Sequence, residues 1–334
     1  MSKFALEVLE RYVHPFIKNN DPDVILGSVF GEDVAITRVR DGVLVSHVDP
    51  IVGAVKDIGW LAVHVACNDI ATSGTPPRWI LVLVLVPRKE DEQMLEEIMR
   101  DASRAAAELG VTIIGGHSGY SSNLARPLVA VTALGTITDL QPVQTRGARL
   151  GDHVLITKGV ALEGTAILAN DFADTAIELG LSQADLESAR QLMKSVSIVP
   201  EALILANQGA TSMHDVTRGG LLETLLEMAK LSQVKIQVEQ TKISLSPIVE
   251  RFAKAFDFNP LKMISSGTLV ATVPPGQVEA ATEQLRKAGI SFSDIGQIVE
   301  GEGVQINHGE TMRLYHDIHC EEDELARMWE LYPR

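Results

Sequence analysis

Carboxylate side chains recur at the ends of apolar stretches of this chain, each beside glycine, asparagine, serine or threonine. Such polar segments occur at Gly31-Glu32-Asp33, His47-Val48-Asp49, Cys67-Asn68-Asp69, Gly115-Gly116-His117 and 214–220 (HDVTRGG). Carboxylates with no lysine nearby are typical ligands of a divalent cation, and a bound cation favours a phosphate-bearing ligand. The pattern therefore predicts metal–nucleotide binding without a P-loop.

The bulk composition limits the classes of protein to be considered. The chain has 334 residues, 46% hydrophobic and 22% charged, which is ordinary for an α/β protein of one large or two medium domains. Its net charge of −15 disfavours nucleic-acid binding and means that Lys and Arg alone could not hold a nucleotide. No signal peptide or membrane span is expected, and two cysteines, Cys67 and Cys320, fit a reducing cytoplasm.

Strands alternating with helices are expected in both halves of the chain. In the first half we expect helices at 4–18, 56–73 and 90–109, and strands at 43–48, 79–86, 111–114 and 128–137. A turn at 147–152 predicts a boundary between domains at 1–148 and 149–334. In the second half we expect helices at 160–170, 182–195, 199–208 and 219–230, and strands at 153–157, 234–239, 268–273 and 295–306.

Each candidate position has a structural interpretation beside the functional one. Asp33 is either an exposed aspartate in a turn or a metal ligand. Asp49, which precedes Pro50, is either a loop aspartate that bonds its own backbone or a side chain that points off the end of a strand toward a ligand. Asn68-Asp69 lies in an apolar helical pattern, where a buried carboxylate needs a metal, a nucleotide or an internal hydrogen bond.

Two glycine-rich segments offer backbone amides to a ligand. Gly116 and His117 follow a short apolar strand, where glycine lets a backbone approach a phosphate closely. Thr217 is expected to cap the helix that follows it, with Arg218 and the amide of Gly219 facing an anion at the helix N-terminus.

The order and spacing of these segments resemble the AIR synthase-related superfamily. This superfamily includes aminoimidazole ribonucleotide synthase, the hydrogenase maturation factor HypE, selenophosphate synthetase and thiamine-monophosphate kinase. The Asn-Asp helix and the Asp-x-Thr-Arg-Gly-Gly segment are most similar to the HypE branch. The resemblance rests on 31–35 (GEDVA), Asp49, 67–76 (CNDIATSGTP), 115–117 (GGH), 213–220 (MHDVTRGG) and 295–299 (IGQIV).

The resemblance implies a fold and a ligand. The fold would be two-domain α/β (α+β), with an N-terminal ATP-binding domain whose sheet forms a barrel with a second copy, and a C-terminal α/β sandwich. ATP and Mg²⁺ would be bound, and a homodimer is implied. The implied metal ligands are Asp33, Asp49, Asp69 and Asp215. The nucleotide site would be completed by Asn68, Gly116, His117, Thr217, Arg218 and Gly219. The implied catalytic residues are Asp69, His117 and Asp215.

Three departures from HypE limit what the resemblance implies. HypE ends in Pro-Arg-Ile-Cys, whereas this chain ends in 331–334 (LYPR). HypE has Asp-Thr-Lys where this chain has 117–119 (HSG), and a Glu before glycine where this chain has 265–267 (SSG). We therefore do not expect dehydration of a carbamoyl group on the chain's own terminal cysteine. The reactive Cys or Sec of selenophosphate synthetase and the paired acids of thiamine-phosphate kinase are also missing from the matching segments.

The sequence thus predicts an ATP- and magnesium-dependent HypE-like protein. It would phosphorylate a carbonyl or amide oxygen of an unknown small substrate and work beside another hydrogenase maturation protein. One alternative is a nucleotide-binding partner or scaffold in a maturation complex that has lost catalysis. Another is an AIR synthase-like dehydrating cyclo-ligase, which has only Arg126, Arg146 and Arg218 to offer a substrate phosphate.

Overall fold

A computed structural model describes residues 11, 21–27, 29, 31–52, 56–138, 141–309, 311–316 and 323–332. The chain folds into two compact units. The first comprises the described residues of Asn19–Ser28 and Asp33–Pro142, and the second those of Val29–Glu32 and Val143–Arg334. Apart from Arg11, the helix expected at 4–18 lies outside the described residues.

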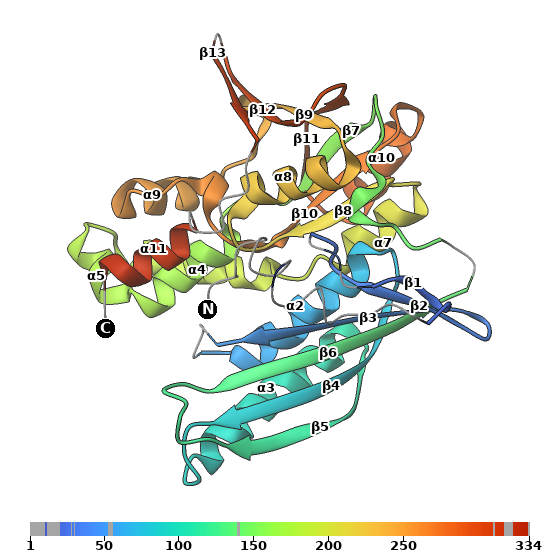
Figure 1. The fold of residues 1–334 in the computed structure, drawn as a ribbon. Helices are drawn as coiled ribbons and strands as arrows, with labels where there is room; N and C mark the ends of the chain where they lie inside the picture. Colours follow the sequence, from blue (N-terminus) through green and yellow to red (C-terminus); the bar gives the residue numbers. More distant parts are fainter. Residues whose placement is uncertain are drawn as a thin grey trace. The chain divides into compact units, whose positions relative to one another are not determined.

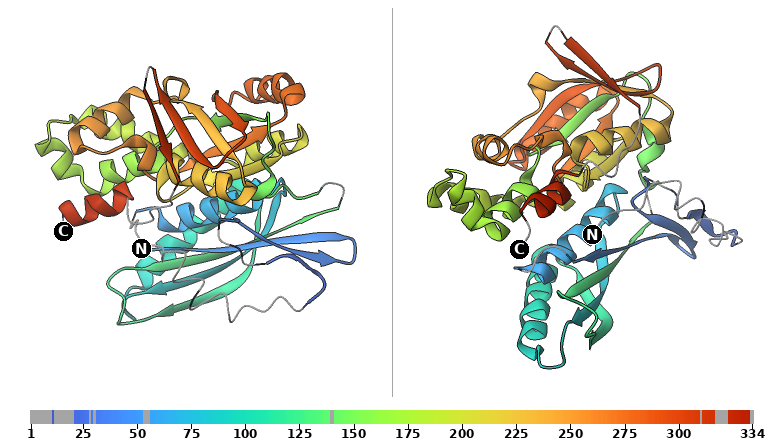
Figure 2. Two further views of the ribbon diagram at one scale, coloured as in Figure 1. Left: turned by 45° about the horizontal axis from the view of Figure 1, so that its top comes forward. Right: turned by 60° about the vertical axis from the view of Figure 1, so that its left-hand side comes forward.

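The first unit is a six-stranded sheet with two helices, α2 (Ile58–Thr72) and α3 (Glu92–Leu109), along one face (Figures 1 and 2). Among the described strands of this sheet, only β4 and β5 pair in parallel, because α3 connects them in a crossover. In sheet order the strands are β1 (Val24–Leu26), β2 (Ala35–Val39), β3 (Gly42–Ile51), β6 (Leu128–Ile137), β4 (Pro77–Val86) and β5 (Thr112–Tyr120).

Side-chain alternation gives this sheet two apolar faces. In β4, Ile80, Val82 and Val84 are buried, whereas Leu81 is 37% exposed. Successive side chains of a strand point to opposite faces, so the helices cover the first set and Leu81 lies on the open face. The barrel expected from this sheet and a second copy stays a prediction.

The described helices of the first unit lie within two residues of their predicted bounds. All residues of α2 except Trp60 are buried, and the helix gives way to Gly74, whose φ is 76°. Helix α3 ends at Gly110, with a φ of 68° and its amide bonded back to the last turn. Glycine tolerates this left-handed conformation, which explains both stops.

Two predicted strand ends are wrong. β3 does not stop at Asp49-Pro50 but pairs with β6 as far as Ile51. On its other side β3 pairs with β2 only up to Ser46, so no described neighbouring strand needs the amide hydrogen that Pro50 lacks. Likewise β5 continues through Gly115-Gly116 to Tyr120 as a partner of β4.

The second unit is built on a seven-stranded sheet. The strand expected at 295–306 is in fact two strands, because Gly301 turns the chain with a φ of 119°. In sheet order the strands are β13 (Thr311–Tyr315), β12 (Gly303–His308), β9 (Lys235–Glu239), β11 (Phe292–Val299), β7 (His153–Thr157), β10 (Ser265–Val273) and β8 (Ser212–Val216).

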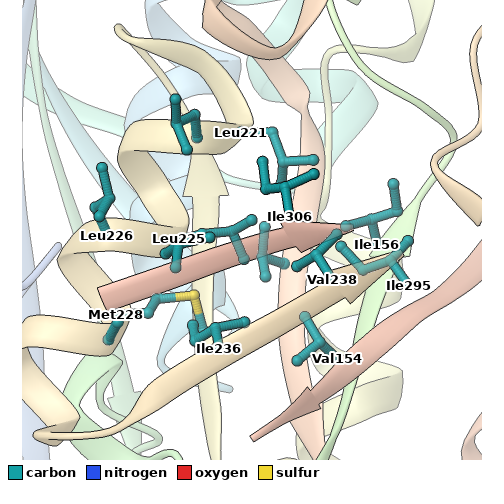
Figure 3. Close-up of a cluster of buried hydrophobic side chains, with 14 of the residues drawn as sticks. Val154, Ile156, Leu221, Leu225, Leu226, Met228, Ile236, Val238, Ile295 and Ile306 are labelled. Carbon is teal, nitrogen blue, oxygen red and sulfur yellow. The ribbon is translucent and has the colours of Figure 1, made fainter. Parts of the chain in front are cut away.

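Helix α8 (Gly220–Ser232) covers one face of this sheet, and its Leu221, Leu225 and Met228 meet Ile236 and Val238 of β9 in the core shown in Figure 3. Helices α4 (Leu162–Asp171) and α7 (Val199–Asn207) also contact β10, and α10 (Val278–Lys287) packs on α7. A second cluster around Phe252 and Phe256 joins α4, α5 (Ala173–Glu178), α6 (Gln183–Gln191), α9 (Pro247–Phe256) and α11 (Glu324–Leu331). Within the described ranges, no helix is long and apolar enough to cross a bilayer.

Candidate functional site

In the first unit, strand β3 and helix α2 bring His47 and Asp69 together. The Nε2 atom of His47 lies 3.3 Å from Oδ2 of Asp69, whose side chain is only 8% exposed. Asn68, next to Asp69, is fully buried in the same turn of α2. The expectation that this polar pair finds partners inside the fold is consistent with the His47 contact. Asp49 follows His47 by two residues in β3, so it lies on the same face of the sheet.

Cys67 precedes Asp69 by two residues and is buried in α2. Burial, and secondarily the negative charge of Asp69, raises the pKa of the Cys67 thiol to about 12. The thiolate is the reactive form of cysteine, so we expect native Cys67 to resist iodoacetamide at neutral pH. Peptide mass spectrometry would check this, with the urea-unfolded chain as the reactive control. Rapid alkylation of Cys67 in the native protein would contradict the packing of α2.

His117 lies on the opposite face of the sheet from α2. Its register partner in β4 is Leu83, and a Cβ on Gly119, two residues on, would meet His117 at 3.4 Å and Leu85 at 3.3 Å. His117 therefore shares the open face with Leu81 and Leu85. Within the first unit, His117 is not brought to the His47–Asp69 pair, and its catalytic role stays a prediction.

Glycine is required at Gly116, beside His117. Its φ is 147°, and a Cβ there would lie 1.8 Å from the carbonyl oxygen of Val82. The glycine thus allows β5 to approach β4, which is a packing reason for this residue that holds with or without a ligand. Asp33 lies in the short irregular segment before β2 and is partly buried.

In the second unit, Asp215 lies in β8 with no solvent exposure. Neither of its carboxylate oxygens accepts a hydrogen bond from a described residue. Its Oδ1 atom lies 3.6 Å from Nδ1 of His214. A buried carboxylate without hydrogen bonds is costly unless a cation compensates it, so the chemistry of this side chain fits a metal ligand.

His214 connects this strand to helix α8. Its Nδ1 atom lies 2.7 Å from the backbone oxygen of Asp215, and its Nε2 atom lies 3.1 Å from Oε2 of Glu227. Both side chains are at most 4% exposed. Glu227 was not predicted as a site residue, although a carboxylate inside the apolar run 225–229 (LLEMA) is a visible signal.

The N-terminus of α8 differs from the expectation. Gly219, not Thr217, is the N-cap residue, and glycine has no side chain with which to cap the helix; Gly220 donates its amide to the carbonyl of Thr217. The amide of Gly219 donates to Asp323 at 3.4 Å, and a Cβ on Gly219 would lie 1.7 Å from the carboxylate of Glu223. Carboxylates of the chain itself therefore lie where Arg218 and Gly219 were expected to face a phosphate.

A buried polar cluster lies at the C-terminal end of β7, around Lys158. Lys158 bonds Glu201 at 2.6 Å and the backbone oxygens of Ser195 and Ser197, and burial lowers its pKa although Glu201 opposes this. Lys158 has a φ of 60°, a backbone strain that often marks functional sites. This lysine was also missed by the sequence analysis.

Glu163 lies in the same region. Its carboxylate accepts hydrogen bonds from the amide and the hydroxyl of Ser266. Ser266 stands in the segment where the HypE resemblance implies a glutamate, so α4 brings a carboxylate to that segment from elsewhere in the sequence. Across the sheet, Ser265 of β10 pairs with Val216, next to Asp215.

Comparison with known families gives the same result for both halves of the chain. Residues 31–137 match the N-terminal domain of the AIR synthase related proteins, and residues 149–309 match the C-terminal domain. The chain belongs to the AIR synthase-related family. The mixed α/β fold with a sheet in each half agrees with this membership.

Relatives of this family member include hydrogenase maturation proteins. Carbamoyl dehydratase HypE of Bradyrhizobium diazoefficiens is 28% identical over 80% of this chain and 78% of its own length. Selenide, water dikinase of Citrifermentans bemidjiense is 26% identical over 89% of this chain and 92% of its own. The relatives thus include HypE proteins, as the sequence predicted.

Solved structures share the fold. The structure of a HypE–HypF complex matches with a TM-score of 0.76 and 20% identity, covering 92% of this chain and 98% of the matched chain. HypE in complex with ATP matches with a TM-score of 0.70 and 24% identity, covering 88% of this chain and 89% of the other. At these identities the likeness confirms the two-domain α/β architecture alone.

Proposed function

We propose that this protein binds ATP with Mg²⁺ and phosphorylates a carbonyl or amide oxygen of a small substrate, as a HypE-like member of its family. The single observation that carries the proposal is Asp215, a fully buried carboxylate with no hydrogen bond to either oxygen from the described residues. Such a group fits a hard cation that prefers oxygen ligands. The relationship to HypE, solved elsewhere with ATP, supports the identity of the nucleotide.

The proposed metal ligands are Asp33, Asp49, Asp69 and Asp215, whose carboxylates would offer oxygens to the ion. Mg²⁺ when bound would neutralise charge on the nucleotide phosphates and align them for attack. Asn68 and the backbone at Gly219 would contact the nucleotide. The hydrogen bond from the Gly219 amide to Asp323 would have to break before a phosphate could accept from that amide.

Nucleotide-dependent stabilisation and turnover test this function. We expect ATP with Mg²⁺ to raise the melting temperature, and EDTA to remove the effect, because a ligand of the native state stabilises it by mass action. Phosphate or ADP release should then appear with a small carboxamide or carbonyl compound as acceptor. No stabilisation and no turnover with any acceptor would overturn the proposal.

A second candidate is a nucleotide-binding partner in a maturation complex. It is favoured by Ser266, which stands where the HypE resemblance implies a glutamate, and by the likeness to a HypE known in complex with HypF. Stabilisation by ATP and Mg²⁺, capture of a maturation protein and no turnover would select this candidate. The carboxylate of Glu163 at Ser266 argues for retained catalysis.

We also propose a homodimer through the open face of the six-stranded sheet, where Leu81 is 37% and Val48 58% exposed. Burying apolar area is the main driving force of association, so Leu81→Arg should convert a dimer to a monomer. Light scattering after size exclusion would measure the mass. Leu314→Arg, on β13 of the second unit, is the control and should stay dimeric. A monomeric wild type would contradict the proposal.

A further inference from the structure

Both nitrogens of the buried His214 ring have partners. Nδ1 lies 2.7 Å from the backbone oxygen of Asp215, and Nε2 lies 3.1 Å from Oε2 of Glu227. A carbonyl oxygen only accepts, so Nδ1 must carry the hydrogen of that bond. Glu227 then holds the other end of the ring, whether the hydrogen between them is on Nε2 or on the carboxyl group. The two contacts together prevent the imidazole from turning.

The ring orientation matters because it reaches the main chain of Asp215. The same carbonyl lies 3.5 Å from Oγ1 of Thr224, which also comes from α8. β8 is an edge strand, paired only with β10 among the described strands. The contacts of Thr224 and Glu227 from α8 therefore help to hold β8, which has a neighbouring strand on one side only among the described strands.

The side chain of Asp215 has no comparable support of its own. Neither carboxylate oxygen accepts a hydrogen bond from the described residues. Its direction is consequently set by the backbone from which it projects and by packing. A group that fixes the Asp215 peptide also fixes where the carboxylate points.

We propose that Glu227 is a positioning residue: through the ring of His214 it holds the Asp215 peptide so that the buried carboxylate is aimed at its ligand. This inference rests on the proposed function, since the ligand is taken to be the metal of a metal–nucleotide complex. Partners one shell outside a metal site fix the orientation of the ligating groups. Glu227 belongs to that outer layer and does not touch the nucleotide or the ion.

Three substitutions of Glu227 separate positioning from general support of the fold. Glu227→Met keeps the length of the side chain and fills its space but cannot bond Nε2. Glu227→Gln keeps a hydrogen-bonding partner for the ring. Glu227→Asp keeps the charge but withdraws it from the ring, and it serves if the Met variant does not fold. We expect Met and Asp to weaken binding by about 10- to 100-fold, the usual cost of losing an outer partner, and Gln to restore most of it.

The measurement is the affinity of the full chain for Mn²⁺ in the presence of a non-hydrolysable ATP analogue, followed by electron paramagnetic resonance of free Mn²⁺. Melting temperatures are recorded in parallel without metal. Asp294→Asn is the matched control. Asp294 lies in β11 and its carboxylate is 2.7 Å from Nδ1 of His153, the first residue of β7, so it is remote from β8. It should bind Mn²⁺ like the wild type.

The outcomes are distinguishable. Weak binding by the Met and Asp variants with recovery by Gln supports the positioning role. Wild-type affinity in the Met or Asp variant overturns it while leaving the proposed function intact. Equal loss in all three variants also overturns it, since the hydrogen-bonding partner that Gln keeps for the ring would then not restore binding. No Mn²⁺–nucleotide binding by the wild type removes the proposed function itself.

Discussion

Asp215→Asn is expected to weaken binding of the Mg²⁺–ATP complex by about 100-fold, or about 2.7 kcal/mol, since the substitution removes the charge and one oxygen ligand. The metal-free protein should melt at the same or a higher temperature than the wild type. The reason is that Asp215 is fully buried with no hydrogen bond from the described residues, and an uncompensated buried charge destabilises the fold. Calorimetric titration and thermal melts measure the two effects.

The opposite signs of these effects make the experiment specific. A residue that only supports the fold would lose stability and affinity together. Asp294→Asn, which alters a carboxylate paired with His153 in the same unit, should change neither nucleotide affinity nor metal dependence. Unchanged affinity of Asp215→Asn would contradict a ligand role for this carboxylate, and a large fall in melting temperature would contradict its uncompensated burial.

Asp69→Asn is expected to abolish measurable nucleotide binding as well. Asn has nearly the same shape and can still accept a hydrogen bond from Nε2 of His47, so the local packing should persist. What is lost is the negative charge at a proposed metal ligand. Calorimetric titration with a non-hydrolysable ATP analogue and Mg²⁺ would show the loss.

A carboxylate of α3 provides the comparison for Asp69. Asp101 is partly buried and paired with Arg104 at 3.3 Å, in the same unit, and has no proposed part in binding. Asp101→Asn should bind the nucleotide like the wild type. The account of the first unit fails if Asp69→Asn and Asp101→Asn bind equally well.

The sequence predicted helices better than strand ends, for local reasons. Helix α2 follows from its apolar composition and from the Gly74 stop, and α3 from Gly110, both of which act within a few residues. The ends of β3 and β5 depend instead on which neighbouring strand needs a hydrogen bond. β2 pairs with β3 only up to Ser46, so β2 requires no amide hydrogen from Pro50, and β3 continues along β6 as far as Ile51. The residues around Pro50 do not show which strands will be its neighbours.

The candidate site was predictable in its residue types and less so in their surroundings. The burial of Asn68 and Asp69 agrees with the expectation of polar groups inside an apolar helix. The contacts of Asp215 with His214, and of His214 with Glu227, depend on how α8 packs against β8. The carboxylates at Gly219 come partly from Asp323, more than one hundred positions along the chain.

A crystal structure of the protein with Mg²⁺ and a non-hydrolysable ATP analogue tests the central claim most directly. The account predicts one nucleotide per chain, with a magnesium ion bound to its phosphates and to a carboxylate oxygen of Asp215 or of another proposed ligand, Asp33, Asp49 or Asp69. A nucleotide held with no carboxylate of this set near its metal, or crystals that take up no nucleotide at saturating concentration, would contradict it.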